Sequence, residues 1–322
     1  EKGEMTGCIG AQKKKKIKIK RTVFIVSFLI MPCLNFLIFY LYVNLDAFTM
    51  AFRHTVRGET VWGLTNFRWF FNEFTKPGSE LLLALKNTMI SFGVILVMFP
   101  VSFLVSFFIY KKVYGYRLFR FLFFIPTLIQ GTVVAAMYVK MCNNTMGAVG
   151  PLSRMVQNLL GLEKPPSLLT DPSYANLFVM LNIVWLSFPG DMVIWGGTFS
   201  RIPDSVLESA RLDGVGWVRE AAQIIVPIVW PTFALKLVLS FVGIFGASGN
   251  VFLLTGQGKY GTQTLANWMY MQVFNQNGNL TENGSNVLNQ MSAVGLIITV
   301  ATMIISMIVR FITNHMNEEV TF

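Results

Sequence analysis

The residues of this chain best suited to chemistry are charged side chains crowded into the stretch ESARLDGVGWVREAAQIIVP, residues 208–227. They are Glu208, Arg211, Asp213, Arg219 and Glu220. Two glycines interrupt the stretch, and apolar runs flank it on both sides. Because complementary charges on a surface select a partner and steer its approach, a short charged segment between apolar runs indicates a docking surface for another protein.

Two further ionisable residues lie inside apolar runs, where a charge is costly unless it is paired or hydrated. Asp191 lies about eight residues from the end of one run and Lys236 about eight residues from the start of the next, so at 1.5 Å per helical residue both lie roughly 12 Å deep. We predict that these intramembrane charges form a pair or line a hydrated vestibule together. The alternative is that Lys236 extends to the membrane surface while Asp191 faces an unrelated group.

Enzyme chemistry finds little support in the sequence. The three cysteines form no C-x-x-C pair and the two histidines form no H-E-x-x-H motif, so neither a zinc site nor a disulfide framework is indicated. The nearest approach to a phosphate-binding loop, residues 256–260, lacks the first glycine and the final Ser or Thr of G-x-x-x-x-G-K-[ST]. We therefore expect no catalytic, cofactor-binding or metal-binding residues on this chain.

The composition is that of a membrane protein. Of 322 residues, 53% are hydrophobic and only 13% are charged, and the mean hydropathy is +0.55. Soluble domains carry about a quarter of their residues as charges. The net charge of +10 could suggest a nucleic-acid partner, but the basic residues lie beside the apolar runs. That placement is typical of signals for membrane orientation, so we expect no nucleic acid.

Six apolar runs reach the roughly 20 residues that a membrane-spanning helix needs. We place the spans at 22–44, 82–110, 118–140, 174–199, 228–250 and 291–313. Breaks are expected at Pro189–Gly190 in the fourth span and at Gly243 and Gly246 in the fifth, and such breaks often line a cavity. The predicted fold class is therefore all-α, a polytopic membrane protein with six transmembrane helices.

The distribution of basic residues predicts the orientation of these spans. Of 26 Lys and Arg residues, 16 fall in the candidate inside segments and 9 in the candidate outside segments. The positive-inside rule then places both termini and the segment 200–227 in the cytoplasm. The expected organisation is a basic cytoplasmic N-terminus at 1–21, a membrane domain at 22–313 and a cytoplasmic tail at 314–322.

The lysine-rich start has a simple explanation in membrane lipid. A basic cluster next to a span binds anionic headgroups and requires no other partner, although a specific lipid or nucleic-acid patch is the alternative. The apolar run that follows is about as long as a full span and shows no Ala-x-Ala cleavage site, so we interpret it as a retained anchor rather than a signal peptide.

The charged stretch itself predicts a helix, a turn and a second helix. Pro203 and Asp204 favour a first helical turn, and Gly214 is placed to end that helix with a positive φ. A second helix is expected from about Gly216–Trp217 to Pro227. The alternative is an amphipathic loop that rests on lipid headgroups, but acidic residues would be repelled by an anionic leaflet.

Residues 208–227 follow the spacing E-[SA]-A-x-x-D-G-x9-I-x-[VL]-P. This spacing resembles the EAA loop of ATP-binding-cassette importer permeases. The positions in register are Glu208, Ala210, Asp213, Gly214, Ile224 and Pro227. The departures are small: Ser209, Val215, Ala221 and Val226 replace the Ala, Ala, Phe and Leu that are usual there.

Two further stretches extend the resemblance over most of the chain. Residues 85–88 are similar to the family's L-x-N-T entry to its core, and residues 254–265 to its L-T-x-G-G-P loop, although Lys259 stands where Pro is usual. Together they resemble the carbohydrate branch of the family, which includes the larger maltose and glycerol-phosphate permease subunits.

The resemblance implies a coupling function for the charged stretch. In that family the EAA loop lies in a cleft of a cytoplasmic ATPase, where its acidic residue meets an ATPase arginine. When these roles are carried over to this chain, Glu208 is the acid that contacts the ATPase, and Gly214 forms the bend of a coupling helix. The implied ATPase-docking set is Glu208, Ala210, Arg211, Asp213, Gly214 and Pro227.

The resemblance also implies an assembly in a bacterial cell membrane. Its other members are a second homologous permease, two ATPase subunits that bind the ATP and Mg²⁺, and a solute-binding protein outside the membrane. The outside segments 45–81, 141–173 and 251–290 would contact that binding protein. This chain would not itself be an enzyme.

The solute path is expected in the fourth and fifth spans. Sugars present hydroxyls and CH faces, so their recognition needs hydrogen-bonding groups beside an apolar or aromatic wall. By resemblance to the maltose system, and from the polar and aromatic residues nearby, the expected path residues are Trp185, Leu186, Ser187, Gly190, Ser240, Phe241, Gly243, Ile244, Ala247 and Ser248. The alternative is that these residues only pack helix against helix through small side chains.

Four functions compete on these observations. The first is a permease subunit for a carbohydrate, above all an oligosaccharide. The second is a permease for another small polar solute, such as a polyol phosphate or a polyamine, against which the lack of a strong charged cluster in the spans argues. The third, a membrane-embedded enzyme, would need convergent acids, histidines or metal ligands, and Asp191 alone is too little. The fourth, a channel, would need symmetric filter sequences, and we find none.

Overall fold

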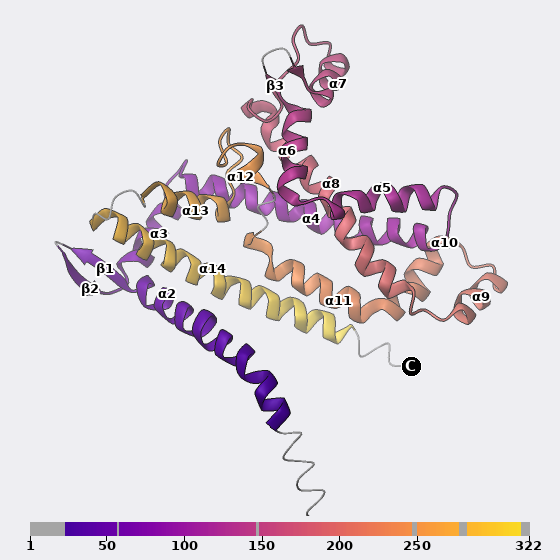
Figure 1. Cartoon of the computed structure of the whole chain (residues 1–322), viewed down its shortest axis with the longest axis horizontal. Coiled ribbons are helices and arrows are strands. Elements are labelled where there is room, and N and C mark those ends of the chain that lie inside the picture. Colours follow the sequence, from indigo (N-terminus) through magenta and orange to yellow (C-terminus); the bar gives the residue numbers. More distant parts are fainter. Residues whose placement is uncertain (1–22, 57, 146–147, 247–249, 277–281, 317–322) are drawn as a thin grey trace, which may run out of the picture.

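The structure is a computed structural model that describes residues 23–56, 58–145, 148–246, 250–276 and 282–316. These residues are mostly helical (Figure 1). In the first half of the chain the elements are η1 (Phe36–Tyr42), α2 (Val43–Ala51), β1 (Arg53–Val56), β2 (Glu59–Trp62), α3 (Thr65–Thr75), α4 (Glu80–Tyr110), α5 (Tyr116–Leu128), α6 (Gly131–Cys142), β3 (Asn144–Thr145), β4 (Ala148–Val149) and α7 (Pro151–Leu160). In the second half they are α8 (Pro172–Phe199), α9 (Asp204–Leu212), α10 (Trp217–Arg219), η2 (Glu220–Ile225), α11 (Val226–Val242), η3 (Ile244–Gly246), α12 (Val251–Leu254), α13 (Leu265–Gln276) and α14 (Glu282–His315).

The strands form two small antiparallel hairpins. β1 pairs with β2 in the register Arg53 opposite Trp62, and β3 pairs with β4. Neither hairpin belongs to a larger sheet within the described residues. The prediction of an all-α polytopic membrane protein is therefore confirmed.

Five helices are long and apolar enough to cross a membrane, and a bent helix pair makes six if it counts as one span. The five are Val23–Ala51, Glu80–Tyr110, Pro172–Phe199, Trp217–Val242 and Asn286–His315. Each overlaps one of the predicted spans. The long apolar runs locate the spans correctly because a helix needs about 20 apolar residues to cross the bilayer.

The third span differs from the prediction. Instead of one straight helix at 118–140, α5 and α6 are bent by 108° at the break between them. Ile129 and Gln130 adopt extended ψ angles of 138° and 135°, which end the helical hydrogen bonding of α5 before α6 begins. Hydropathy alone does not register such a break because both sides of it are apolar.

The fourth and fifth spans show one predicted break and lack another. α8 continues through Pro189–Gly190 without interruption, so the break expected there was wrong, and α8 packs along α4 over much of its length. α11 does end at Val242, where Gly243 caps it and a 3-10 turn follows. The fifth span also begins earlier than predicted, because the second helix of the charged stretch continues directly into it from Trp217.

The helix α4 lies at the centre of the packing. Figure 1 shows α4, α8, α11 and α14 running alongside one another, with α9 and α10 at one end. At that end, the aromatic rings of Phe103, Trp195 and Phe199 form the centre of a buried cluster that also includes residues of α9, η2 and α11. Edge-to-face ring pairs of this kind add to the stability that their buried area provides.

The opposite end of α4 is held by an amide. Asn87 is buried, and its Nδ2 donates hydrogen bonds to the carbonyl oxygens of Gly261 (2.7 Å) and Gln263 (2.9 Å). Thr88 accepts a bond from the backbone N–H of Leu265 at 2.8 Å. Both residues belong to the L-x-N-T stretch, whose polar side chains therefore fasten α4 to the loop before α13.

We predict that Asn87→Ala destabilises the protein by about 1–3 kcal/mol, because two hydrogen bonds donated by a buried amide are lost. Thermal unfolding of the purified protein in detergent measures the effect. The control is Asn176→Ala, since half-buried Asn176 donates to the same Gly261 carbonyl at 3.1 Å where water has better access. Equal losses in the two variants would contradict this assignment.

Candidate functional site

The charged stretch folds as an elbow, by which we mean residues 200–227. α9 begins at Asp204 after Pro203 and ends at Leu212. Gly214 has a φ of 66°, its N–H bonds to the Arg211 carbonyl and the N–H of Val215 bonds to the Ala210 carbonyl, both at 3.1 Å. These are the two bonds of a Schellman motif, which glycine favours because it adopts positive φ without strain. The predicted helix start and stop are thus confirmed.

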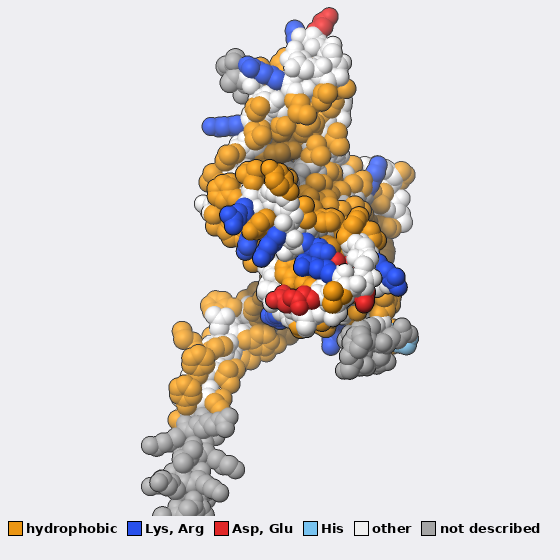
Figure 2. All heavy atoms as spheres, turned by 90° about the vertical axis from the view of Figure 1, so that its right-hand side faces the viewer, with side chains coloured by type: hydrophobic (Ala, Val, Ile, Leu, Met, Phe, Trp, Pro, Cys, Tyr) orange, Lys and Arg blue, Asp and Glu red, His pale blue; other side chains and the backbone are white. Residues whose placement is uncertain are grey.

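The two faces of α9 differ in character. Leu207 and Ala210 are buried against the bundle, whereas Glu208, Arg211 and Asp213 are exposed. Figure 2, which views this end of the molecule, shows acidic and basic side chains lying close together on the surface. In the part of the chain that the structure describes, these three charges join none of the ion pairs, so they remain available to a partner.

The second arm of the elbow is continuous with a span. α10 leads through the π-helical turn η2 into α11, and Pro227 lies in the first turn of α11, directly after η2. Ala221 and Ile225 join the buried aromatic cluster. Glu220 is buried as well and forms an ion pair with Lys111, the residue directly after α4.

Between α4, α8 and α11 lies a polar cavity of about 340 Å³. It is lined by Ile95, Met98, Phe99, Asn182, Ile183, Leu186, Ser187, Gly190, Asp191, Lys236, Ser240 and Asn250. The cavity wall thus contains both intramembrane charges and four of the expected path residues, namely Leu186, Ser187, Gly190 and Ser240. The cavity therefore combines apolar walls from α4 with hydrogen-bonding groups from α8 and α11.

The two intramembrane charges meet, as their equal depth predicts. Lys236 Nζ pairs with Asp191 Oδ1, and the Ser102 hydroxyl donates to Asp191 Oδ2 at 2.6 Å. The two charged side chains are 18% and 19% exposed. The Lys236 ammonium also lies 6.0 Å from the centre of the Phe99 ring, within reach of a cation–π attraction. Ser102, Asp191 and Lys236 thus join α4, α8 and α11 at one point.

Asn182 is a polar residue of the cavity wall whose hydrogen-bonding capacity is unused in this structure. Its side chain is fully buried, and neither amide atom has a hydrogen-bond partner among the described residues. A buried amide without partners costs free energy, so such a group commonly meets water or a ligand. The hydroxyls of Ser187 and Ser240 donate to backbone carbonyls of their own helices, which leaves oxygen lone pairs free to accept.

The remaining expected path residues lie elsewhere. Trp185 stacks on Tyr138 of α6, with ring centres 6.0 Å apart. Phe241 packs edge-on against Phe92, and Ile244 is buried in the same small cluster. Gly243 caps α11. Ala247 and Ser248 fall outside the described residues.

Sequence reasoning missed the contribution of α4 to the cavity. Ser102, Met98 and Phe99 lie on that helix. A signal was present, because the buried polar residues Asn87, Ser91, Ser102 and Ser106 are separated by four and eleven positions, which places them on one helical face. The pairing of Lys111 with Glu220 was also missed, since nothing in the spacing of two residues 109 positions apart indicates a contact.

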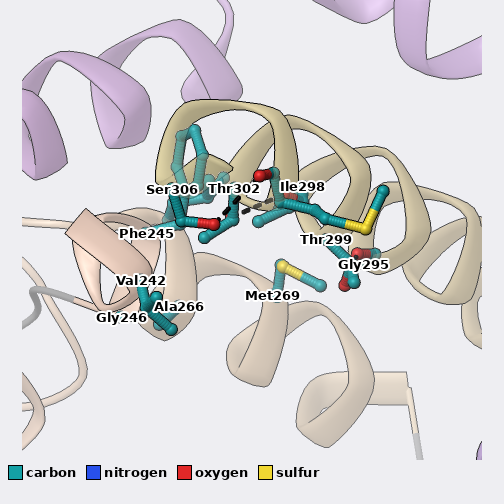
Figure 3. Close-up of a pocket in the computed structure, with 12 residues that line it drawn as sticks. Val242, Phe245, Gly246, Ala266, Met269, Gly295, Ile298, Thr299, Thr302 and Ser306 are labelled. Atoms are coloured by element: carbon teal, nitrogen blue, oxygen red, sulfur yellow. Dashed lines mark hydrogen bonds between the residues drawn. The ribbon is translucent and has the colours of Figure 1, made fainter. Parts of the chain in front are cut away.

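A larger cavity of about 610 Å³ lies between α13, α14 and the α11–η3 junction. Figure 3 shows Thr299 and Thr302 on the face of α14 that lines it, opposite Phe245 and Met269. Their hydroxyls, and that of Ser306, bond to backbone carbonyls of the same helix. Its lining, as far as the described residues form it, includes no ionisable side chain and no amide side chain, so the smaller cavity is the better candidate for recognition of a polar solute.

The spans, the elbow and the polar cavity together define a multi-pass membrane transport subunit. Residues 110–321 match the family model described as binding-protein-dependent transport system inner membrane component, and the chain belongs to this family. It is accordingly a multi-pass inner membrane protein.

Two curated relatives share part of the sequence. The probable ABC transporter permease protein YurN of Bacillus subtilis (strain 168) is 28% identical over 191 residues, 59% of this chain and 62% of that protein. The maltodextrin transport system permease protein MdxF of the same strain is 26% identical over 216 residues, 64% of this chain and 48% of that protein. The chain thus spans less than two thirds of the length of either relative.

A solved structure shares the fold. A chain in the crystal structure of a bacterial alginate ABC transporter in complex with an alginate pentasaccharide-bound periplasmic protein superposes with a TM-score of 0.76. The identity is 21%, and the match covers 93% of this chain and 97% of that chain. At this identity the likeness establishes the arrangement of helices.

We predict that Lys236→Met destabilises the protein by about 3–5 kcal/mol, because it leaves the Asp191 carboxylate buried without its partner. The matched control is Lys236→Met combined with Asp191→Leu, which removes both charges and should restore most of the loss. Thermal unfolding in detergent measures both variants. A single variant as stable as the wild type would show that the pair is fully hydrated.

Proposed function

We propose that this chain is the permease subunit of an ATP-driven importer and forms half of the translocation path for a carbohydrate, above all an oligosaccharide. The observation that carries the proposal is the polar cavity between α4, α8 and α11, which is joined through α11 to an elbow with unpaired surface charges. The continuous helix Trp217–Val242 thus runs from the elbow, which carries the surface for a second protein, to the site for a polar solute.

The elbow is the proposed dock for an ATPase subunit. Glu208 and Asp213 are exposed acids on a helix whose end is fixed by the Gly214 turn. A rigid, charged protrusion pairs with a basic cleft at little entropic cost because its geometry is already set. In this proposal Glu208 contacts a basic ATPase residue, Arg211 and Asp213 extend the contact, and ATP and Mg²⁺ are held by the ATPase.

The cavity favours a neutral solute rich in hydroxyl groups. Its cation and its anion are paired with each other, so the described lining carries no surplus charge for a polyamine or a phosphate. Asn182 offers both donors and an acceptor, and Phe99 and Met98 supply an apolar wall. The maltodextrin relative bears the name of a neutral oligosaccharide, which supports this class, whereas the alginate transporter bears the name of an acidic polysaccharide and supports only a carbohydrate in general.

The outside segments are the proposed contact for a solute-binding protein. The hairpin β1–β2, α3, α7 and α13 all belong to the predicted outside segments 45–81, 141–173 and 251–290. A second, homologous permease would supply the other half of the path, and two ATPase subunits would complete the assembly.

We predict that the tagged chain, purified from solubilised membranes of its native host, brings down an ATPase and a second permease. Glu208→Ala should lower the recovered ATPase at least about tenfold, because loss of a desolvated charged contact costs 2 kcal/mol or more. The control is Asp204→Asn, an exposed acid on the same helix at its far end. Wild-type protein that comes down alone and without ATPase activity would contradict the importer assignment.

We predict that vesicles carrying the complex, with ATP enclosed on the side that corresponds to the cytoplasm, accumulate neutral malto-oligosaccharides. They should not accumulate spermidine or glycerol 3-phosphate. Asn182→Leu should lower uptake by about tenfold, since one lost hydrogen bond to a buried group is worth about 1.4 kcal/mol. Ser292→Ala, on an exposed face of α14, serves as the control. Uptake of the charged solutes alone would contradict the proposed solute class.

A further inference from the structure

A largely buried ion pair, Lys111 with Glu220, joins the elbow to the end of α4. Lys111 directly follows α4, and Glu220 is the first residue of the π-helical turn η2. Glu220 is only 2% exposed, and the Lys111 ammonium also lies 5.6 Å from the centre of the Phe107 ring. The contact is therefore buried on the Glu220 side, while the Lys111 side chain is 22% exposed.

We propose that Lys111 and Glu220 are positioning residues that make α4 follow the elbow, so that a displacement of the elbow by its partner reaches the polar cavity. This inference rests on the proposed function, because it assigns how the docking surface acts on the solute path. It concerns two residues outside the EAA register.

Of the ion pairs among the described residues, this is the one that ties the elbow to the bundle. Among the described residues, the other side-chain contacts of the elbow with the bundle are mainly apolar. They involve Ile202, Leu207, Trp217, Ala221 and Ile225. Apolar contacts are non-directional and allow sliding. An ion pair with one buried partner holds the two groups in one geometry, because separation would leave the Glu220 carboxylate buried and unpaired.

From Lys111 the helix α4 leads directly to the cavity. Ser102 lies nine residues earlier on the same helix, about 14 Å along its axis, and bonds to Asp191. Asp191 in turn pairs with Lys236 of α11, the helix that continues from Glu220. Two polar links thus connect α4 with α11, one at the elbow and one, through α8, in the wall of the cavity.

Stability alone does not account for this pair. A buried ion pair can often be replaced by apolar residues of similar volume with no loss of stability. One Glu220 oxygen, Oε1, has no hydrogen-bond partner among the described residues, so the carboxylate is not fully satisfied. The pair also lies at a π-helical turn, a feature that is frequent at functional sites. These observations favour a role in fixing geometry.

The test compares the wild type with the double variant Lys111→Leu/Glu220→Leu, which keeps the site filled while it removes both charges. Spin labels are placed at Tyr114→Cys, shortly after α4, and Val218→Cys, on the second arm of the elbow and outside the docking set, which are 100% and 57% exposed. Cys8, Cys33 and Cys142 are replaced by serine in both proteins. The distance between the labels is measured in the co-purified complex in nanodiscs, without nucleotide and after trapping with ATP and vanadate.

In the wild-type complex we expect one narrow distance distribution that is the same in both states, because elbow and α4 move as one body. In the double variant the distribution should shift or broaden on trapping, and ATP hydrolysis should continue while solute uptake is lost. Lys112→Gln, an exposed neighbour, is the control and should behave as the wild type.

Three outcomes would overturn the inference, and they can be told apart. A double variant whose distances and uptake match the wild type would show that the pair only fills space. A wild-type distribution that changes on trapping would show that α4 does not follow the elbow. A wild-type chain that brings down no ATPase would remove the proposed function, and this inference with it.

Discussion

Polar groups within the apolar bundle must find their partners inside the protein, and α4 provides the contacts that tie several elements together. A membrane offers no water to an unpaired donor or acceptor, so each such group is either satisfied or costly. Along one face of α4, Asn87 holds the loop before α13, Ser102 holds Asp191, and Lys111 at its end holds Glu220. The other spans are arranged around these contacts.

This arrangement gives the cavity its chemistry. The carboxylate of Asp191 has both oxygens occupied, one by Ser102 and one by Lys236, so the charges in the wall cancel. The amide of Asn182 is left without a partner in the described lining. A site of this kind has hydrogen-bonding capacity but no net charge, which is the property that a neutral, hydroxyl-rich solute requires.

The sequence allowed the fold to be predicted where the signal was local. Apolar runs located the spans, and the Asp204 start and Gly214 stop of α9 follow from capping chemistry that involves only a few neighbouring residues. The pairing of Asp191 with Lys236 could be predicted because helical rise converts sequence distance into depth. The bend between α5 and α6 and the unbroken course of α8 could not, because they depend on contacts between helices rather than on composition.

The candidate site was predicted only in part for the same reason. Leu186, Ser187, Gly190 and Ser240 do line the cavity, whereas Trp185 and Phe241 pack against rings of α6 and α4. Aromatic residues near a path satisfy packing and recognition equally well, so sequence alone does not separate the two uses. The α4 contribution becomes visible only when the helices are placed side by side.

The central claim is that the elbow transmits the action of a docked ATPase to the solute path. Electron cryo-microscopy of the complex isolated through this chain, in nanodiscs, tests it most directly. The account predicts that density for an ATPase subunit encloses α9 and contacts Glu208 and Asp213. An α9 that lies against lipid headgroups, with any ATPase bound elsewhere, would contradict it.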